Sequence, residues 1–120
     1  MLALSRRVKA LIPTYEPCGL DARIYPHWKD ASCFTLVEFD EEKIYSVKAK
    51  RLASDDLIIN LVKREGIGYV IALSLSVRAV ELLNKVGVTV LTGNVKTVRE
   101  AIEHFRNKKL YVLKVIKTRM

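Results

Sequence analysis

Residue types that bind soft metals gather in one segment of the chain. Cys18, His27 and Cys33 lie there together with the only tryptophan, Trp28. Thiolates and imidazoles bind zinc and iron–sulfur clusters, and three such ligands would leave positions open for a cluster in transit. The spacing C-x8-H-x5-C matches no compact ligand motif. A structural interpretation stays open, in which Cys33 is buried at a strand start, Cys18 is incidental and His27 forms a loop hydrogen bond.

Cations and a helix start accompany these ligands. Arg23 and Lys29 lie in the same segment, where they could attract an anionic cluster or could be ordinary surface charge. Ser74 precedes an expected helix, and free backbone N–H groups at such a start favour an anion. Trp28 is expected to anchor the segment on the core by burying its ring, or to shield a site. Residues 18–33 are therefore predicted to form an ordered loop of functional interest.

Three strands are predicted to surround this loop. Their expected ranges are residues 8–12, 33–39 and 44–50. Pro13 is expected to end the first strand. The second and third strands are rich in β-formers or alternate in polarity, which predicts an antiparallel hairpin. Lys48 and Lys50 place the third strand at a solvated edge of the sheet.

The second half of the chain predicts three helices that alternate with two parallel strands. The helices are expected to begin after the capping residues Ser54, Ser76 and Thr97. The first helix is expected to bury Leu57, Ile58, Leu61 and Val62. The resulting order, β-β-β-α-β-α-β-α, predicts a three-layer α/β domain with a five-stranded mixed sheet. Residues 110–117 are rich in β-formers and are expected to add an edge strand or to pair with another subunit.

Length and composition predict a single domain over residues 1–120. No apolar run approaches the ~18 residues of a membrane span, and the N-terminal charges follow the apolar residues, unlike a secretory signal. We therefore expect a cytoplasmic protein without membrane partners, in which Cys18 and Cys33 are reduced unless they hold a metal. The absence of glutamine and the abundance of charge fit a thermophile.

The net charge of +8 comes entirely from the second half of the chain. Residues 1–60 carry nine Lys or Arg and nine Asp or Glu, whereas residues 61–120 carry twelve and four. Such asymmetry can mark a nucleic-acid partner or simply a solubilising face with a basic tail. No aromatic and basic motif of a known nucleic-acid module is present.

An enzymatic function has little support in the sequence. Residues 7–12 carry no carboxylate, although a two-metal nuclease needs one on its first strand. The motifs G-x-S-x-G, GxGxxG and the P-loop are absent. We therefore expect a non-catalytic protein.

Several short motifs occur in an order that resembles the domain family associated with dinitrogenase iron–molybdenum cofactor. These motifs are Ile12-Pro13, Gly19-Leu20-Asp21, His27-Trp28, Gly87-Val88-Thr89-Val90 and Thr97-Val98-Arg99-Glu100. The resemblance covers about residues 8–110 and leaves a basic tail at residues 111–120. Three segments depart from the family pattern: Trp28-Lys29, the turn at residues 73–76 and the short connection at residues 51–54.

The resemblance implies a ribonuclease-H-like fold and a protein that binds or carries an iron–sulfur or iron–molybdenum type cluster. It implies that His27 is the best candidate ligand and that a cluster donor or acceptor protein is a candidate partner. Cys33 is a second candidate metal ligand by its residue type. The cofactor-binding candidates are His27, Cys33, Cys18, Arg23 and Ser74. The alternatives are a basic nucleic-acid-binding module, or a protein-interaction domain without a cofactor that is a monomer or dimerises through residues 110–120.

Overall fold

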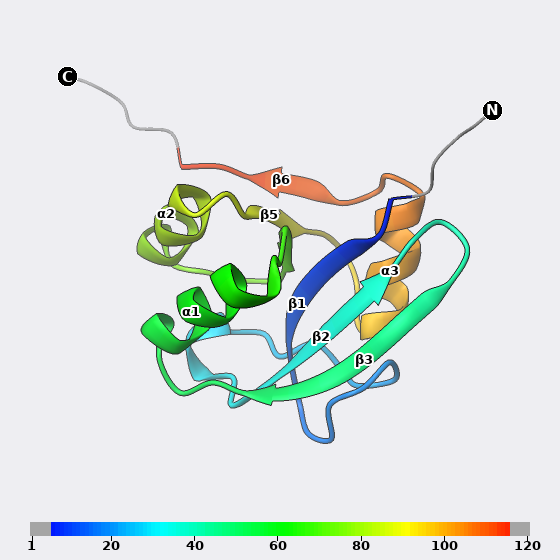
Figure 1. Cartoon of the computed structure of the whole chain (residues 1–120), viewed down its shortest axis with the longest axis horizontal. Coiled ribbons are helices and arrows are strands. Elements are labelled where there is room, and N and C mark those ends of the chain that lie inside the picture. Colours follow the sequence, from blue (N-terminus) through cyan, green and yellow to red (C-terminus); the bar gives the residue numbers. More distant parts are fainter. Residues whose placement is uncertain (1–5, 116–120) are drawn as a thin grey trace.

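A single mixed sheet of six strands organises the protein in the computed structural model, which describes residues 6–115 (Figure 1). The strands are β1 (Val8–Thr14), β2 (Cys33–Phe39), β3 (Ile44–Arg51), β4 (Tyr69–Ile71), β5 (Thr89–Thr92) and β6 (Tyr111–Leu113). The helices are η1, a 3-10 turn at Trp28–Asp30, then α1 (Asp55–Glu65), α2 (Val77–Lys85) and α3 (Val98–Arg106). Part of the N-terminal segment considered as a signal, residues 1–5, and the end of the basic tail, residues 116–120, lie outside the described residues.

The strand order β3-β2-β1-β4-β5-β6 combines antiparallel and parallel pairs. β1, β2 and β3 pair antiparallel, β4 and β5 extend the sheet in parallel with β1, and β6 returns antiparallel to β5. The predicted α/β fold with a mixed sheet is therefore confirmed. The tail supplies the sixth strand, which confirms the expected extra edge strand within residues 110–115, and β3 forms the opposite edge.

The three helices begin at the capping residues that the sequence predicts. The side-chain oxygens of Ser54, Ser76 and Thr97 accept hydrogen bonds from the backbone N–H groups of Leu57, Ala79 and Glu100. Gly66 ends α1 in the left-handed conformation, with φ at 68°. The expected burial of Leu57 is wrong, because this side chain is 47% exposed.

Helices cover both faces of the sheet and enclose two apolar layers (Figure 1). On one face, α1 and α2 pack over residues of β1, β2, β4 and β5, including Leu11, Phe34 and Val70. On the other face, α3 packs over Ile12, Val37 and Ile71. Neighbouring strand residues serve opposite layers because successive side chains in a strand point to opposite faces.

Pro13 does not end β1, in contrast to the prediction. The side of Pro13 on which other residues carry an N–H faces away from β2. The Pro13 carbonyl accepts a hydrogen bond from the Tyr25 N–H (2.9 Å), outside the ladder with β2. The N–H and C=O of one strand residue point to the same side, so proline removes no bond from that ladder. β1 therefore continues to Thr14 and carries the following loop beyond the end of β4.

Candidate functional site

The loop between β1 and β2, residues 15–32, is fastened at many points. The Tyr15 N–H donates to the Arg23 carbonyl (2.9 Å), which folds the first part of the loop back on itself. The Ile24 N–H donates to the Lys96 carbonyl (2.8 Å), and the Val98 N–H at the start of α3 donates to the Ala22 carbonyl (3.1 Å). The prediction that residues 18–33 form an ordered loop is therefore confirmed.

Trp28 anchors the second part of the loop on the opposite face of the sheet. Its side chain is only 4% exposed and meets Phe34 edge-on, with ring centroids 5.1 Å apart. Its backbone N–H donates to the Ser74 carbonyl in the turn between β4 and α2 (3.1 Å). The predicted anchoring role is confirmed, and these contacts fix the position of the neighbouring His27.

His27 lies on the surface immediately before η1. The residue is exposed, and its backbone carbonyl accepts a hydrogen bond from the Asp30 N–H (3.1 Å). Its side chain does not cap the short helix. The loop thus presents an imidazole to solvent beside the turn that holds Ser74, at the end of the sheet where β1 and β4 finish. Such an imidazole can bind a metal through either ring nitrogen.

Cys18 and Cys33 form a disulfide bond, so the expectation that both are reduced is wrong for this structure. Their Cα atoms lie 6.3 Å apart, within the range that a disulfide spans. Cys33 is fully buried as the first residue of β2, which confirms the structural interpretation of that residue. A disulfide sulfur is not a thiolate, so neither cysteine is a metal ligand in this state.

A pair of threonine hydroxyls lies beside the disulfide, where the Thr14 hydroxyl contacts the Cys18 sulfur at 3.6 Å. The side chains of Thr14 and Thr35 are hydrogen-bonded to each other at 3.0 Å, and both threonines are almost completely buried. The Gly19 N–H donates to the Thr35 hydroxyl at 3.2 Å. These hydrogen bonds satisfy buried polar groups, each of which would cost about 1–3 kcal/mol if it had no partner. They tie the beginning of the loop to β2 independently of the disulfide.

The five candidate cofactor-binding residues separate into two groups. Arg23 and Cys18 line one hollow of about 430 Å³ along the beginning of the loop, and Cys18 is bonded to Cys33. His27 and Ser74 lie together instead on the side that Trp28 anchors. Within residues 6–115, no three His, Cys, Asp or Glu side chains come together in a group that could hold a metal ion. The structure therefore offers one exposed imidazole rather than a closed ligand cage.

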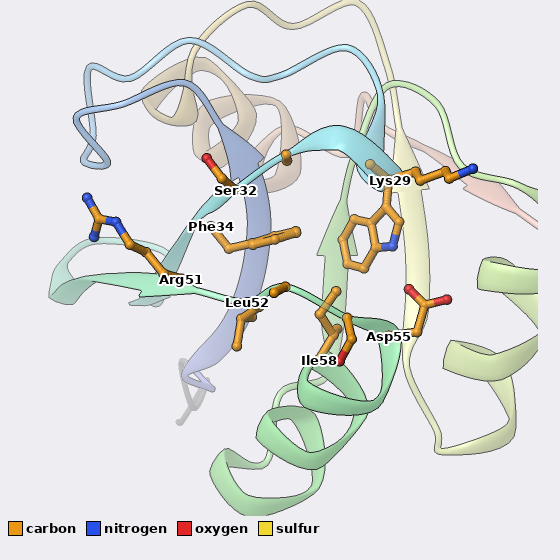
Figure 2. Close-up of a pocket in the computed structure, with 11 residues that line it drawn as sticks. Lys29, Ser32, Phe34, Arg51, Leu52, Asp55 and Ile58 are labelled. Atoms are coloured by element: carbon orange, nitrogen blue, oxygen red, sulfur yellow. The ribbon is translucent and has the colours of Figure 1, made fainter.

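A second hollow lies beside Trp28 and was not predicted from the sequence. It has a volume of about 500 Å³, and its walls come from η1, the end of β3 and the start of α1 (Figure 2). Phe34, Leu52 and Ile58 supply apolar surface, and Asp55 lies at its α1 wall. These residues come from distant parts of the chain and share no sequence motif. His27 is not among the residues that line this hollow.

The most strongly shifted pKa in the described residues belongs to Asp40, which follows the last residue of β2. A hydrogen bond from the Tyr45 hydroxyl to the Asp40 carboxylate (2.5 Å) is the largest of several influences that lower the pKa of Asp40 to about 2. The backbone N–H groups of Glu42 and Lys43 also donate to this carboxylate at 2.8 Å each. The same contact raises the pKa of Tyr45. This cluster shapes the β2–β3 turn and is separate from the loop.

Two cations of the basic second half make internal contacts. The Arg99 guanidinium contacts the Asp21 carboxylate at 3.1 Å, and the Arg106 Nε donates to the Asp40 carbonyl at 2.9 Å. Arg106 also pairs with Glu103 at 3.2 Å. Part of the positive charge that predicts a polyanion partner therefore fastens α3 to the loop and to the β2–β3 turn.

No helix within residues 6–115 is long and apolar enough to cross a membrane. Comparison with curated proteins finds no match.

Solved structures with the same fold come from several microorganisms. The apo form of the orange protein from Desulfovibrio gigas is 18% identical with a TM-score of 0.73, and the match covers 92% of this chain and 96% of that one. A protein from Methanocaldococcus jannaschii is 18% identical with a TM-score of 0.74, over 90% and 96% of the two chains. A Thermotoga protein assigned to the DUF35 family is 22% identical with a TM-score of 0.71, over 92% and 97%.

A family model covers most of the chain. The model described as dinitrogenase iron–molybdenum cofactor matches residues 9–108, close to the range over which the sequence motifs suggest the resemblance. That range includes both cysteines, His27, all three α-helices and, apart from Val8, the first five strands. The chain therefore belongs to the dinitrogenase iron–molybdenum cofactor family.

Proposed function

We propose that this protein is a non-catalytic carrier that binds an anionic cluster of the iron–sulfur or iron–molybdenum type as cargo and passes it to a partner protein. Membership of the family supports the kind of cargo. The observation that carries the proposal is the exposed His27 imidazole, which the buried Trp28 holds at a defined place beside the turn at Ser74. A solvent-facing imidazole on an anchored backbone can bind and release a metal centre without rearrangement of the core.

The ligand set fits cargo in transit better than a resident cofactor. Stable iron–sulfur clusters are usually held by four protein ligands, mostly thiolates. Here one imidazole is exposed, and the disulfide removes both thiols of the loop. A cluster bound through His27 would keep most of its coordination positions for a donor or acceptor. Such exchangeable binding is the property that a carrier requires.

Positive charge and a helix start supply the rest of the proposed binding. Lys29 is exposed two residues after His27, and the chain carries a net charge of +8. The N-terminus of α2 follows Ser74 closely, and its first turn contains no acidic residue. Backbone N–H groups and the helix dipole at that end favour an anion. These features support the binding of a cluster with negative charge, although Trp28-Lys29 departs from the family pattern.

Anaerobic reconstitution with ferrous iron and sulfide tests the proposal. We expect the wild-type protein to retain iron and visible absorbance after desalting, and we expect His27→Ala to lose both. His104→Ala is the matched control, because His104 is the only other histidine and lies in α3. The experiment is run with and without a dithiol. Absence of iron from the wild-type protein in both conditions would refute the proposed function.

The dithiol arm separates His27 from the cysteines. If His27 is the ligand, iron retention depends on His27 whether or not the disulfide is reduced. Cys33→Ala should then retain about as much iron per folded protein as the wild type, although the variant is less stable. Retention that appears only after reduction and disappears in Cys33→Ala would assign the ligand role to the thiols and contradict the proposal for His27.

A further inference from the structure

The hollow beside Trp28 has the size and composition of a small-molecule site. Its volume of about 500 Å³ lies within the usual range of ligand pockets, roughly 300–1,000 Å³. Its apolar surface includes Phe34, Leu52 and Ile58, which are labelled around the hollow in Figure 2. This site adjoins the proposed cluster site, because Lys29 lines the hollow whereas His27 and Ser74 do not.

Trp28 brings an unused hydrogen-bond donor to this hollow. The residue is only 4% exposed, yet its indole N–H donates to no other residue in the described part of the chain. No fully inaccessible side-chain nitrogen or oxygen in that part of the chain lacks a partner. The indole N–H is therefore reachable from solvent. Indole groups that are mostly buried usually find an acceptor, so this donor is available to an acceptor that enters the hollow.

Asp55 places an acceptor on the same hollow. The Asp55 carboxylate rises from the first turn of α1 toward the segment that carries Lys29 (Figure 2). Within residues 6–115 it forms no ion pair or side-chain hydrogen bond. Asp55 and Trp28 also line the same smaller hollow next to this one, so they are neighbours. A donor and an acceptor thus lie side by side above an apolar, aromatic surface.

We propose that this hollow binds a planar heteroaromatic molecule that has an amino donor next to a ring-nitrogen acceptor, as an aminopurine has. The ring packs against the apolar wall at Phe34, the amino group donates to the Asp55 carboxylate, and the ring nitrogen accepts from the Trp28 indole. Ordinary aromatic molecules would use the apolar wall alone. The paired polar groups therefore supply the specificity, since a site that is built to hydrogen-bond a ligand rejects one that lacks the group.

Adenosine is the first probe, and Trp28 itself is the reporter. The chain contains a single tryptophan, so its indole N–H gives one assignable signal in a nitrogen-15 correlation spectrum. We expect adenosine, titrated to ~10 mM, to shift this signal saturably. Purine riboside, which lacks the amino group, is the matched ligand. It is expected to bind about tenfold more weakly, because one hydrogen bond to a charged group is lost.

Two adjacent carboxylates provide the matched variants. Asp55→Ala removes the acceptor, and we expect adenosine affinity to fall about tenfold. Asp56→Ala changes the same first turn of α1 at a residue that does not line the hollow, and it should bind like the wild type. A Trp28 signal that adenosine does not shift would overturn the proposal. Equal binding of both nucleosides, or of Asp55→Ala and the wild type, would also overturn it.

Discussion

Removal of the disulfide should destabilise the protein by an amount that the structure allows us to estimate. The bond joins residues separated by 15 positions in the sequence. Closing a loop of that size restricts the unfolded chain and contributes about 3 kcal/mol at 25 °C. Cys18→Ala is the preferred change, because Cys18 is half-buried, whereas replacing the fully buried Cys33 would add a packing cost. The predicted loss for Cys18→Ala is therefore about 3 kcal/mol.

Urea unfolding measures this loss. With a typical slope for a small domain, a loss of about 3 kcal/mol lowers the unfolding midpoint by about 1–3 M urea. A dithiol should lower the midpoint of the wild-type protein to that of Cys18→Ala and should leave Cys18→Ala unchanged, which is the internal control. Equal midpoints for the wild-type protein with and without dithiol would refute the reasoning, since the thiols would then be free or the loop would not be constrained.

Three further predictions concern the fold. The pKa of Asp40 is about 2 against the ordinary 3.8, so the contribution of its carboxylate to stability is complete above pH 4 and is lost as the pH falls to 2. The difference in unfolding free energy between the wild type and Asp40→Asn should therefore narrow from about pH 4 to pH 2. A difference that stays constant would contradict this prediction. Thr97→Ala removes the cap of α3 and should cost about 1 kcal/mol in urea unfolding, and no loss would argue against the cap. Leu61→Ala should cost about 2–5 kcal/mol and Leu57→Ala much less, because only Leu61 is fully buried; similar losses in calorimetry would contradict the assigned face of α1.

The fold was predictable where local signals decide the structure. The caps at Ser54, Ser76 and Thr97 require only a side-chain oxygen and an N–H three residues later. The exposure of Leu57 was not predictable in this way. On an ideal helix, Leu57 lies about 90° from the centre of the stripe formed by Ile58, Leu61 and Val62. A residue at such a border is buried or exposed according to the neighbouring layer.

The candidate site was predictable in part. The resemblance and the chemistry both identify His27, and the structure exposes it, but its role as a ligand stays a prediction. The pairing of Cys18 with Cys33 depends on the path of the intervening loop, which spacing alone does not give. The hollow beside Trp28 depends on Leu52 and Asp55, which reach it only when β3 ends and α1 begins at the right place. Such juxtapositions arise from tertiary structure.

The most direct test of the proposed carrier is to detect a histidine nitrogen on the bound cluster. Protein that contains nitrogen-15 histidine is reconstituted anaerobically, and pulsed electron paramagnetic resonance measures the coupling between the cluster and imidazole nitrogen. We predict a single class of coupled nitrogen in the wild-type protein and in His104→Ala, and none in His27→Ala. A cluster without nitrogen coupling in the wild-type protein, or coupling that persists in His27→Ala, would contradict the account.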